Sequence, residues 1–369
     1  MTTLGAAMQK HRGIGPGFDF LRLFLALSVV LWHSFQVSYG NDFAFRTMDG
    51  PYRALIYFIV PAFFALSGYL VAGSMVRLDD VRIFLVFRAL RIVPALGTEI
   101  TLSALILGPM VTSFALSRYF TDREFVVYFT NIVGLIKYHL PGVFLDNPVS
   151  GVVNGQLWTV PAELHCYVAL AVLMLTRLAR RRWAMLGVFL AYAGALSLSW
   201  FLPDGQFTWM ALQSSSLFVA CFLCGNVFYL WRDAIPASRL LLAGAVAAYG
   251  LVTYVVPALS YLLGVAAITY ATCYLGLRPM PRVPLLMRGD YSYGIYLYSY
   301  PLQQFVIWAL PGQREWYFNL AIAAPITILF SMASWHGIEK PMLSLRKRFS
   351  PKVVAPRRTA VDAPLAETR

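Results

Sequence analysis

The stretch FDFLRLFLALSVVLWHSF, residues 18–35, decides the fold class because it is long and apolar enough to cross a bilayer as a helix. It contains two ionisable side chains, Arg22 and His33, which are eleven positions apart. At about 100° per residue they project from one face, about 16 Å apart along the axis. Ionisable side chains inside a membrane are costly and usually face a protein interior or a water-filled cavity. This stripe is therefore a candidate functional path.

A simpler interpretation of the same pair remains open. Long basic side chains near a helix end can extend to the lipid headgroups, so Arg22 can be a surface anchor. His33 is then a structural polar residue close to the outer interface.

The composition extends the membrane interpretation to the whole chain. Of 369 residues, 59% are hydrophobic and 13% are charged, against about 25% charged in soluble domains. We therefore predict an all-α, polytopic bundle of transmembrane helices. The expected spans are residues 18–38, 52–74, 92–113, 157–176, 183–202, 208–231, 238–255, 257–276, 291–310 and 317–338. The seventh and eighth are separated at Pro257, where a helix would be kinked or ended.

The net charge of +13 does not indicate nucleic-acid binding, because the basic residues gather in short loops between apolar segments. If both termini are cytoplasmic, 23 of the 30 Lys and Arg residues fall on the cytoplasmic side. This bias is the pattern of the positive-inside rule. It supports an even number of spans and places both termini in the cytoplasm.

Residues 1–345 are expected to form one transmembrane domain, and residues 346–369 a basic cytoplasmic tail that is rich in Pro and Ala and disordered. We predict no metal site. The four cysteines lie within apolar spans, where free cysteine packs as a small hydrophobe; they are Cys166, Cys221, Cys224 and Cys273.

A basic segment precedes the third span. The sequence DDVRIFLVFRALR, residues 79–91, predicts a separate interfacial helix, with Pro94 opening the span itself. Arg88 and Arg91 are three positions apart and so share a face. Two forked donors of this kind suit a phosphate-bearing ligand. Attraction to anionic lipid headgroups would explain them equally well.

The fourth span opens with QLWTVPAELH, residues 156–165. Glu163 then lies about two turns into the membrane from the outer face, close to the depth expected for His33. A carboxylate beside an imidazole is a plausible acid/base pair, since the carboxylate can orient the ring and stabilise its protonated form. Alternatively, Glu163 forms a structural ion pair with an arginine. His165 points elsewhere and is expected to be structural.

Two further spans carry polar side chains. In the second span, Ser67-Gly68 allows a close approach between helices. The ninth span contains a run of hydroxyl side chains that continues inward from the membrane interface, which indicates the polar lining of a cavity. The residues expected to support such a cavity are Ser67, Tyr69, Trp158, Tyr296, Ser299 and Tyr300.

Six motifs occur in a fixed order along about residues 14–345. They are Arg22 with His33, FFALSGY (63–69), RALRIVP (88–94), LWTVPAE (157–163), YSYGIYLYSYP (291–301) and IEKP (338–341). Together they resemble the acyltransferase 3 family, integral-membrane enzymes that O-acetylate surface polysaccharides and related glycans. Many relatives have histidine in the ninth-span motif where this chain has Ser299, so the role of that histidine does not carry over.

The resemblance implies an O-acetyltransferase of the bacterial cytoplasmic (inner) membrane. The donor would be acetyl-CoA, a substrate bound from the cytoplasm rather than a resident cofactor, with Arg88 and Arg91 on its phosphates and Arg22 lining its path. His33, supported by Glu163, would be the catalytic base. The acceptor would be a carbohydrate or glycolipid, with membrane lipids around the bundle and no nucleic-acid partner.

A transporter or flippase is the alternative. In that case the intramembrane Arg, His and Glu form a proton or substrate path instead of a catalytic site.

Overall fold

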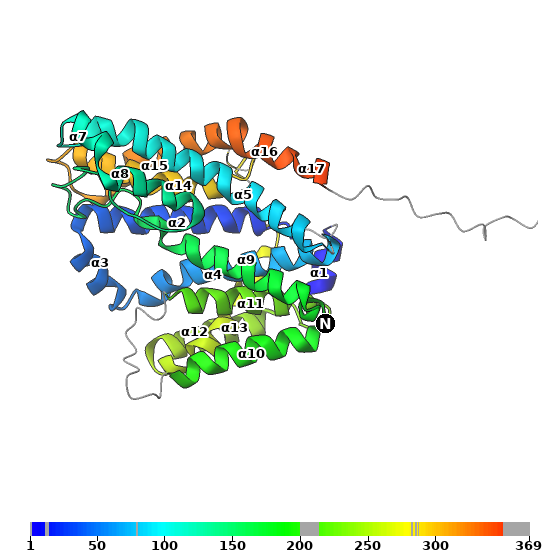
Figure 1. The fold of residues 1–369 in the computed structure, drawn as a ribbon. Helices are drawn as coiled ribbons and strands as arrows, with labels where there is room; N and C mark the ends of the chain where they lie inside the picture. The colour runs from blue at the N-terminus through cyan, green and yellow to red at the C-terminus, as the bar shows by residue number, and fades with distance from the viewer. Residues whose placement is uncertain are drawn as a thin grey trace, which may run out of the picture.

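The computed structural model describes residues 2–11, 15–78, 80–199, 214–281, 283–284, 286 and 288–349. Within these ranges the chain forms a bundle of helices without strands, as the sequence predicts. Most of the long helices run side by side across the view in Figure 1. The predicted tail beyond residue 349 lies outside the described residues, as does Arg12. Residues 200–213, which comprise the end of predicted span five, the loop after it and the start of predicted span six, also lie outside them.

The helices of the N-terminal half are α1 (Leu4–Lys10), α2 (Phe18–Tyr39), α3 (Asn41–Met48), α4 (Arg53–Leu78), α5 (Val81–Leu102), α6 (Gly108–Val111), α7 (Leu116–Thr121), α8 (Arg123–Tyr128) and α9 (Val160–Leu175). A π-helix, Ser103–Leu107, joins α5 to α6, and a 3-10 turn, Gly155–Thr159, leads into α9.

The remaining helices are α10 (Arg182–Ser199), α11 (Ser215–Leu230), α12 (Arg239–Tyr254), α13 (Val265–Gly276), α14 (Ser292–Ala309), α15 (Trp316–Ser334), α16 (Lys340–Ser344) and α17 (Arg346–Phe349). As predicted, the chain breaks at Pro257, where a short 3-10 turn and a π-helix precede α13. The four cysteines are buried and free, in agreement with their predicted place in the core.

Seven helical segments of the described chain are long and apolar enough to cross a membrane. They are Phe18–Tyr39, Arg53–Leu78, Val81–Val111, Gly155–Leu175, Arg182–Ser199, Pro257–Gly276 and Trp316–Phe349. The helices α11 and α12 are apolar but shorter, and α14 is not among the seven. Each predicted span overlaps a helix, while the number ten stays a prediction.

The predicted boundary before the third span is wrong. Residues 81–91 are not a separate interfacial helix, because α5 runs without a break from Val81 to Leu102 and includes Pro94. Proline removes one backbone hydrogen bond, but packed neighbours in a transmembrane bundle allow such a helix to continue. Arg88 and Arg91 therefore lie in the middle of a spanning helix instead of in front of it.

The backbones of two long helices, α4 and α11, approach each other closely. A Cβ atom added to Gly68 would lie 2.1 Å from the carbonyl oxygen of Phe222, and one added to Gly225 would lie 2.3 Å from that of Ala65. Small residues at a helix interface let two backbones approach in this way. The close approach predicted at Ser67-Gly68 is confirmed.

The two ends of the bundle differ in the segments that they carry. The short helices α1 and α17 lie at one end, and α3, α7 and α8 lie at the opposite end (Figure 1). We call these the α1 end and the α3 end. Arg22, near the start of α2, lies toward the α1 end, whereas His33 lies on the half of α2 that leads into α3.

Candidate active site

One cavity gathers three arginines and a glutamate that are far apart in the sequence. We call it the arginine cavity. It has a volume of about 190 Å³ and lies among α2, α4, α5, α9 and α14. Its ionisable lining residues are Arg22, Arg88, Arg91, Glu163, Cys166, Tyr167, Tyr293 and Tyr296.

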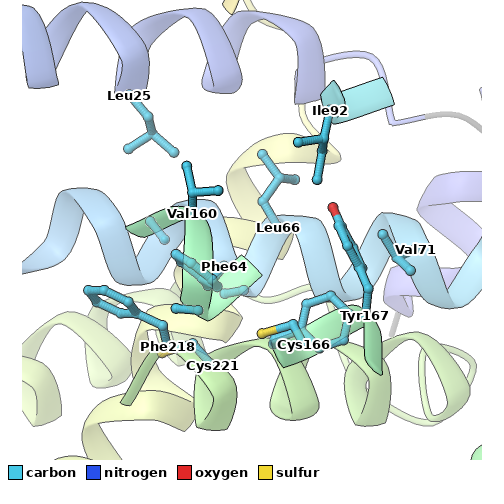
Figure 2. Close-up of a cluster of buried hydrophobic side chains, with 14 of the residues drawn as sticks. Leu25, Phe64, Leu66, Val71, Ile92, Val160, Cys166, Tyr167, Phe218 and Cys221 are labelled. Carbon is cyan, nitrogen blue, oxygen red and sulfur yellow. The ribbon is translucent and has the colours of Figure 1, made fainter. Parts of the chain in front are cut away.

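The rest of the arginine cavity is mostly apolar. Figure 2 shows Leu66 of α4, Ile92 of α5 and Val160 of α9 close to one another, and all three line this cavity. Phe64 and Tyr167 continue the same wall. A ligand in this cavity would therefore meet positive charge and hydrocarbon side by side.

Three carboxylates hold two of the three guanidinium groups. Asp290 Oδ2 lies 2.8 Å from Arg91 Nη2 and 3.1 Å from Arg22 Nη1. Glu339 Oε2 lies 3.1 Å from Arg91 Nη1, and Arg22 also pairs with Asp19. These ion pairs connect α2 and α5 to the start of α14 and to the segment after α15, and so fix the position of Arg91.

The charge state of Asp290 follows from this arrangement. Burial opposes ionisation of its carboxyl group, but the guanidinium groups of Arg91 and Arg22 outweigh burial and lower its pKa to about 2. The hydroxyl of Ser292, which donates to Asp290 Oδ1 at 2.7 Å, acts in the same direction. Asp290 is therefore a carboxylate at neutral pH.

Arg88 differs from the other two arginines. Among the described residues it forms no ion pair, and its contacts are with the ring faces of Phe84 and Tyr167, each 5.8 Å from its Cζ atom. Its buried Nε atom has no hydrogen-bond partner in the described part of the chain. The guanidinium of Arg88 retains its capacity to bind an anion.

Glu163 lines the arginine cavity from the first turn of α9. Its Oε1 atom accepts a hydrogen bond of 2.6 Å from the hydroxyl of Tyr167, one helical turn further on. The partner of this carboxylate is thus a tyrosine of its own helix.

The second cavity lies toward the α3 end and contains His33. We call it the histidine cavity. It has a volume of about 490 Å³. Its polar and aromatic lining residues are Trp32, His33, Gln36, Asn41, Phe45, Tyr138, Trp158, Tyr296 and Tyr300.

His33 is held in this cavity by packing. Its side chain is 6% exposed, and its ring meets that of Tyr300 edge to face at a centroid distance of 5.0 Å. Its buried Nδ1 atom has no hydrogen-bond partner among the described residues. Buried polar atoms normally find a partner, so an unpaired one at a cavity indicates a ligand site.

The predicted pairing of His33 with Glu163 does not appear in the structure, where the two residues line different cavities. The position of a residue along its helix predicts its depth in the membrane, but it does not predict the direction in which the side chain points. The two cavities meet at Tyr296 and Val60, which line both. The hydroxyl of Tyr296 donates to the carbonyl oxygen of Gln156 at 2.6 Å.

The remaining predicted cavity residues divide into two groups. Ser67 lines the arginine cavity, and Trp158 and Tyr300 line the histidine cavity. Tyr69 and Ser299 line neither. The ring of Tyr69 packs in the core and its hydroxyl contacts the sulfur of Met8 at 3.6 Å, while the fully buried Ser299 donates to the carbonyl oxygen of Tyr296 at 3.2 Å.

A family model described as an acyltransferase domain matches residues 16–336. The chain belongs to this acyltransferase family. The match covers every residue named above as lining the two cavities, and it confirms the resemblance that the motifs indicated. With its apolar helices, this acyltransferase is a multi-pass membrane protein.

Two curated relatives cover almost the whole acyltransferase chain. "Nodulation protein 10" of Rhizobium leguminosarum bv. viciae is 28% identical over 379 residues, which span 93% of this chain and 97% of the relative. "O-acetyl transferase" of Shigella phage Sf6 is 28% identical over 353 residues, or 91% and 97% of the two chains. No solved structure matches the acyltransferase.

Residue-level reasoning did not find two members of the site, Asp290 and Glu339. Glu339 lies inside the motif IEKP, and Asp290 directly precedes the ninth-span motif. Neither lies in the middle of an apolar segment, where an ionisable residue is conspicuous. Their position opposite Arg91 follows only from the packing of distant helices.

Proposed function

We propose that the protein transfers an acetyl group from acetyl-CoA, bound from the cytoplasmic side, to a hydroxyl group of a surface or exported carbohydrate. The observation that carries this proposal is the pair of adjoining cavities, one lined by arginines and the other by a buried histidine with an unpartnered nitrogen. The name of the phage relative, an O-acetyl transferase, supports acetyl as the group and oxygen as the acceptor atom.

The arginine cavity suits the donor. Phosphate groups of CoA carry several negative charges, and guanidinium groups bind phosphate through paired hydrogen bonds. Arg88 forms no ion pair in the described chain and is the first candidate ligand, with Arg91 and Arg22 beside it. The apolar wall of Figure 2 fits the uncharged pantetheine arm, which would carry the acetyl thioester toward Tyr296.

His33 is the base in this proposal. Its imidazole removes the proton of the acceptor hydroxyl while that oxygen attacks the carbonyl carbon of the thioester. The carbon–sulfur bond of the resulting tetrahedral intermediate then breaks. The leaving sulfur takes the proton from the imidazolium, which yields an acetyl ester and CoA with a free thiol.

In this proposal Glu163 supports the binding of acetyl-CoA in the arginine cavity. It lines the arginine cavity together with all three arginines and holds the hydroxyl of Tyr167, whose ring lies under Arg88. A carboxylate in this position orients the donor-binding groups and limits the net positive charge of the empty cavity.

The orientation belongs to the same proposal. A bacterial cytoplasmic membrane with the α1 end inside would give the arginine cavity access to cytoplasmic acetyl-CoA, and the positive-inside distribution of the sequence favours this direction. The histidine cavity would then face an acceptor on the outer half. Reporter fusions at the two termini should both give cytoplasmic signals.

The test uses the full-length protein in vesicles supplied with acetyl-labelled CoA and candidate glycans. Covalent label on the glycan is the expected result, and His33→Ala should abolish it while Gln313→Ala, an exposed substitution outside both cavities, should not. Unchanged transfer by His33→Ala would refute the assigned chemistry. Movement of glycan or label across the vesicle membrane without a covalent product would support a transporter instead.

A further inference from the structure

The histidine cavity has an unusual lining for a site of its size. None of the residues that line it in the described chain is Asp, Glu, Lys or Arg, and His33 is its one basic side chain. The three arginines lie in the other cavity, beyond Tyr296. A ligand in the histidine cavity would therefore find no permanent charge to balance its own.

We propose that the histidine cavity binds an uncharged sugar unit of the acceptor and discriminates against sugars that carry a carboxylate, phosphate or sulfate. This inference rests on the proposed function and specifies the acceptor for the same site.

The aromatic lining matches one side of such a ligand. Trp32, Trp158 and Tyr138 contribute large rings to the cavity from three separate segments of the chain, α2, the turn before α9 and the long segment after α8. The apolar C–H face of a pyranose ring can lie against such rings, and Trp and Tyr also keep a polar group for hydrogen bonding.

An amide pair supplies hydrogen bonds for the hydroxyl groups. Gln36 Nε2 donates to Asn41 Oδ1 at 3.0 Å. This bond is local, because Gly40 adopts φ +86° and allows α3 to begin directly after α2. It leaves the carbonyl oxygen of Gln36 and the NH₂ group of Asn41 as an acceptor and a donor on the cavity. Neutral hydroxyl groups need both kinds of partner.

The position of Gln36 connects binding to chemistry. It follows His33 by three residues on α2, so the two side chains share a helix face about one turn apart. A sugar held by the Gln36 amide would present a neighbouring hydroxyl to the imidazole. The residues that bind the sugar thus lie next to the residue that is proposed to activate its hydroxyl group.

Discrimination follows from the cost of removing an anion from water. A carboxylate that enters this half-enclosed cavity loses part of its hydration and gains no ion pair. A hydroxymethyl group at the same ring position loses much less, because the amide pair and the tyrosine hydroxyl groups can satisfy it. The two acceptors should differ in kcat/KM by at least about tenfold, which is at the low end of the cost of leaving a buried polar group without a partner.

The experiment uses the full-length protein, acetyl-labelled CoA and pairs of oligosaccharides with the same length and linkage. Each pair differs at one sugar, glucose against glucuronic acid, galactose against galacturonic acid, or mannose against mannuronic acid. We expect transfer to the neutral member of at least one pair with the preference stated above. Equal or faster transfer to the uronic acid member would overturn this inference and leave the proposed function intact. Transfer to no member of any pair would overturn both.

A charge substitution gives a second readout. Gln36→Lys places a cation in the cavity, so the ratio of kcat/KM for the uronic acid member to that for the neutral member should rise at least about fivefold, as expected for a new ion pair. Gln313→Lys is the matched control. It adds the same charge on an exposed loop at the same end of the bundle, where Tyr39 of α2 meets Glu315 at 2.6 Å. An equal change of the ratio in both variants would contradict a selective cavity.

Discussion

Arg91 and Asp290, 199 positions apart in the sequence, meet at 2.8 Å and connect the middle of α5 to the start of α14. Asp290→Asn removes the negative charge but keeps the shape of the side chain. The partly buried guanidinium groups of Arg22 and Arg91 then lose a carboxylate that neutralises their positive charge. We expect a loss of about 2 kcal/mol of stability and weaker binding of acetyl-CoA, because Arg91 is no longer held in place. Thermal unfolding in detergent measures the loss of stability, and KM for acetyl-CoA measures the weaker binding. Asp146→Asn, on an exposed loop, is the control and should change neither.

The same carboxylate predicts a dependence of stability on pH. Its folded pKa of about 2 is below the ordinary value of 3.8. The stabilisation is therefore complete above about pH 4 and is lost as the pH falls through about 2, with a total of about 2 kcal/mol. Unfolding measured between pH 5 and pH 2 should show this loss in the wild type. If Asp290→Asn shows the same slope over this interval, another group is responsible.

Substitutions of the two arginines in RALRIVP, Arg88 and Arg91, should differ in their effects on acetyl-CoA binding and on stability. Arg88 forms no ion pair in the described chain, whereas Arg91 has two carboxylate partners. Arg88→Gln should raise KM for acetyl-CoA by about tenfold, the loss of one charged hydrogen bond, with little change in thermal stability. Arg91→Gln should also lower the unfolding temperature, because it leaves the buried Glu339 and the partly buried Asp290 without their shared partner. Equal unfolding temperatures for the two variants would contradict this distinction.

His33 and Glu163 line different cavities, so their substitutions should have different kinetic signatures. His33→Gln removes the proposed base and should lower kcat by at least about a hundredfold, the usual contribution of general base catalysis, with KM for acetyl-CoA nearly unchanged. Glu163→Gln should act mainly on KM for acetyl-CoA. Steady-state kinetics at varied donor concentration distinguish the two effects. A loss of kcat alone in Glu163→Gln would restore the direct His33–Glu163 pair that the sequence predicted.

The sequence predicts much of the fold and a large part of the site because both depend on patterns along single helices. Apolar runs mark the helices, and Arg22, Arg88, Arg91 and Glu163 are conspicuous as ionisable residues in or beside them. The structure brings these four residues to one cavity. A charge is costly in any apolar segment, so such a residue is expected to face a partner or a cavity.

What the sequence does not predict is the relation between helices. The sequence predicts similar depths for Glu163 and His33, but the rotation of α9 turns the Glu163 carboxylate into the arginine cavity and toward Tyr167 instead. Asp290 lies before the start of α14, where an acidic residue is common and attracts no notice. Its role becomes visible only when α5 is packed beside it.

The contact between α4 and α11 gives a prediction about the scaffold that holds the arginine cavity, because Ser67, the neighbour of Gly68, lines that cavity. A Cβ atom at Gly68 would lie 2.1 Å from the backbone oxygen of Phe222, so Gly68→Ala must separate the two helices. We expect a loss of at least about 2 kcal/mol of stability, the range for overpacking a well-packed interior.

The matched control for Gly68→Ala is Gly97→Ala on α5, where an added Cβ atom meets nothing within 4 Å. This variant should be as stable as the wild type or more stable by up to about 1 kcal/mol, since alanine favours a helix more than glycine does. Thermal unfolding of both variants in the same detergent decides the matter. If Gly68→Ala unfolds at the wild-type temperature, the close packing of α4 on α11 does not hold the bundle together. A similar loss in both variants would point instead to a general sensitivity of these helices to substitution.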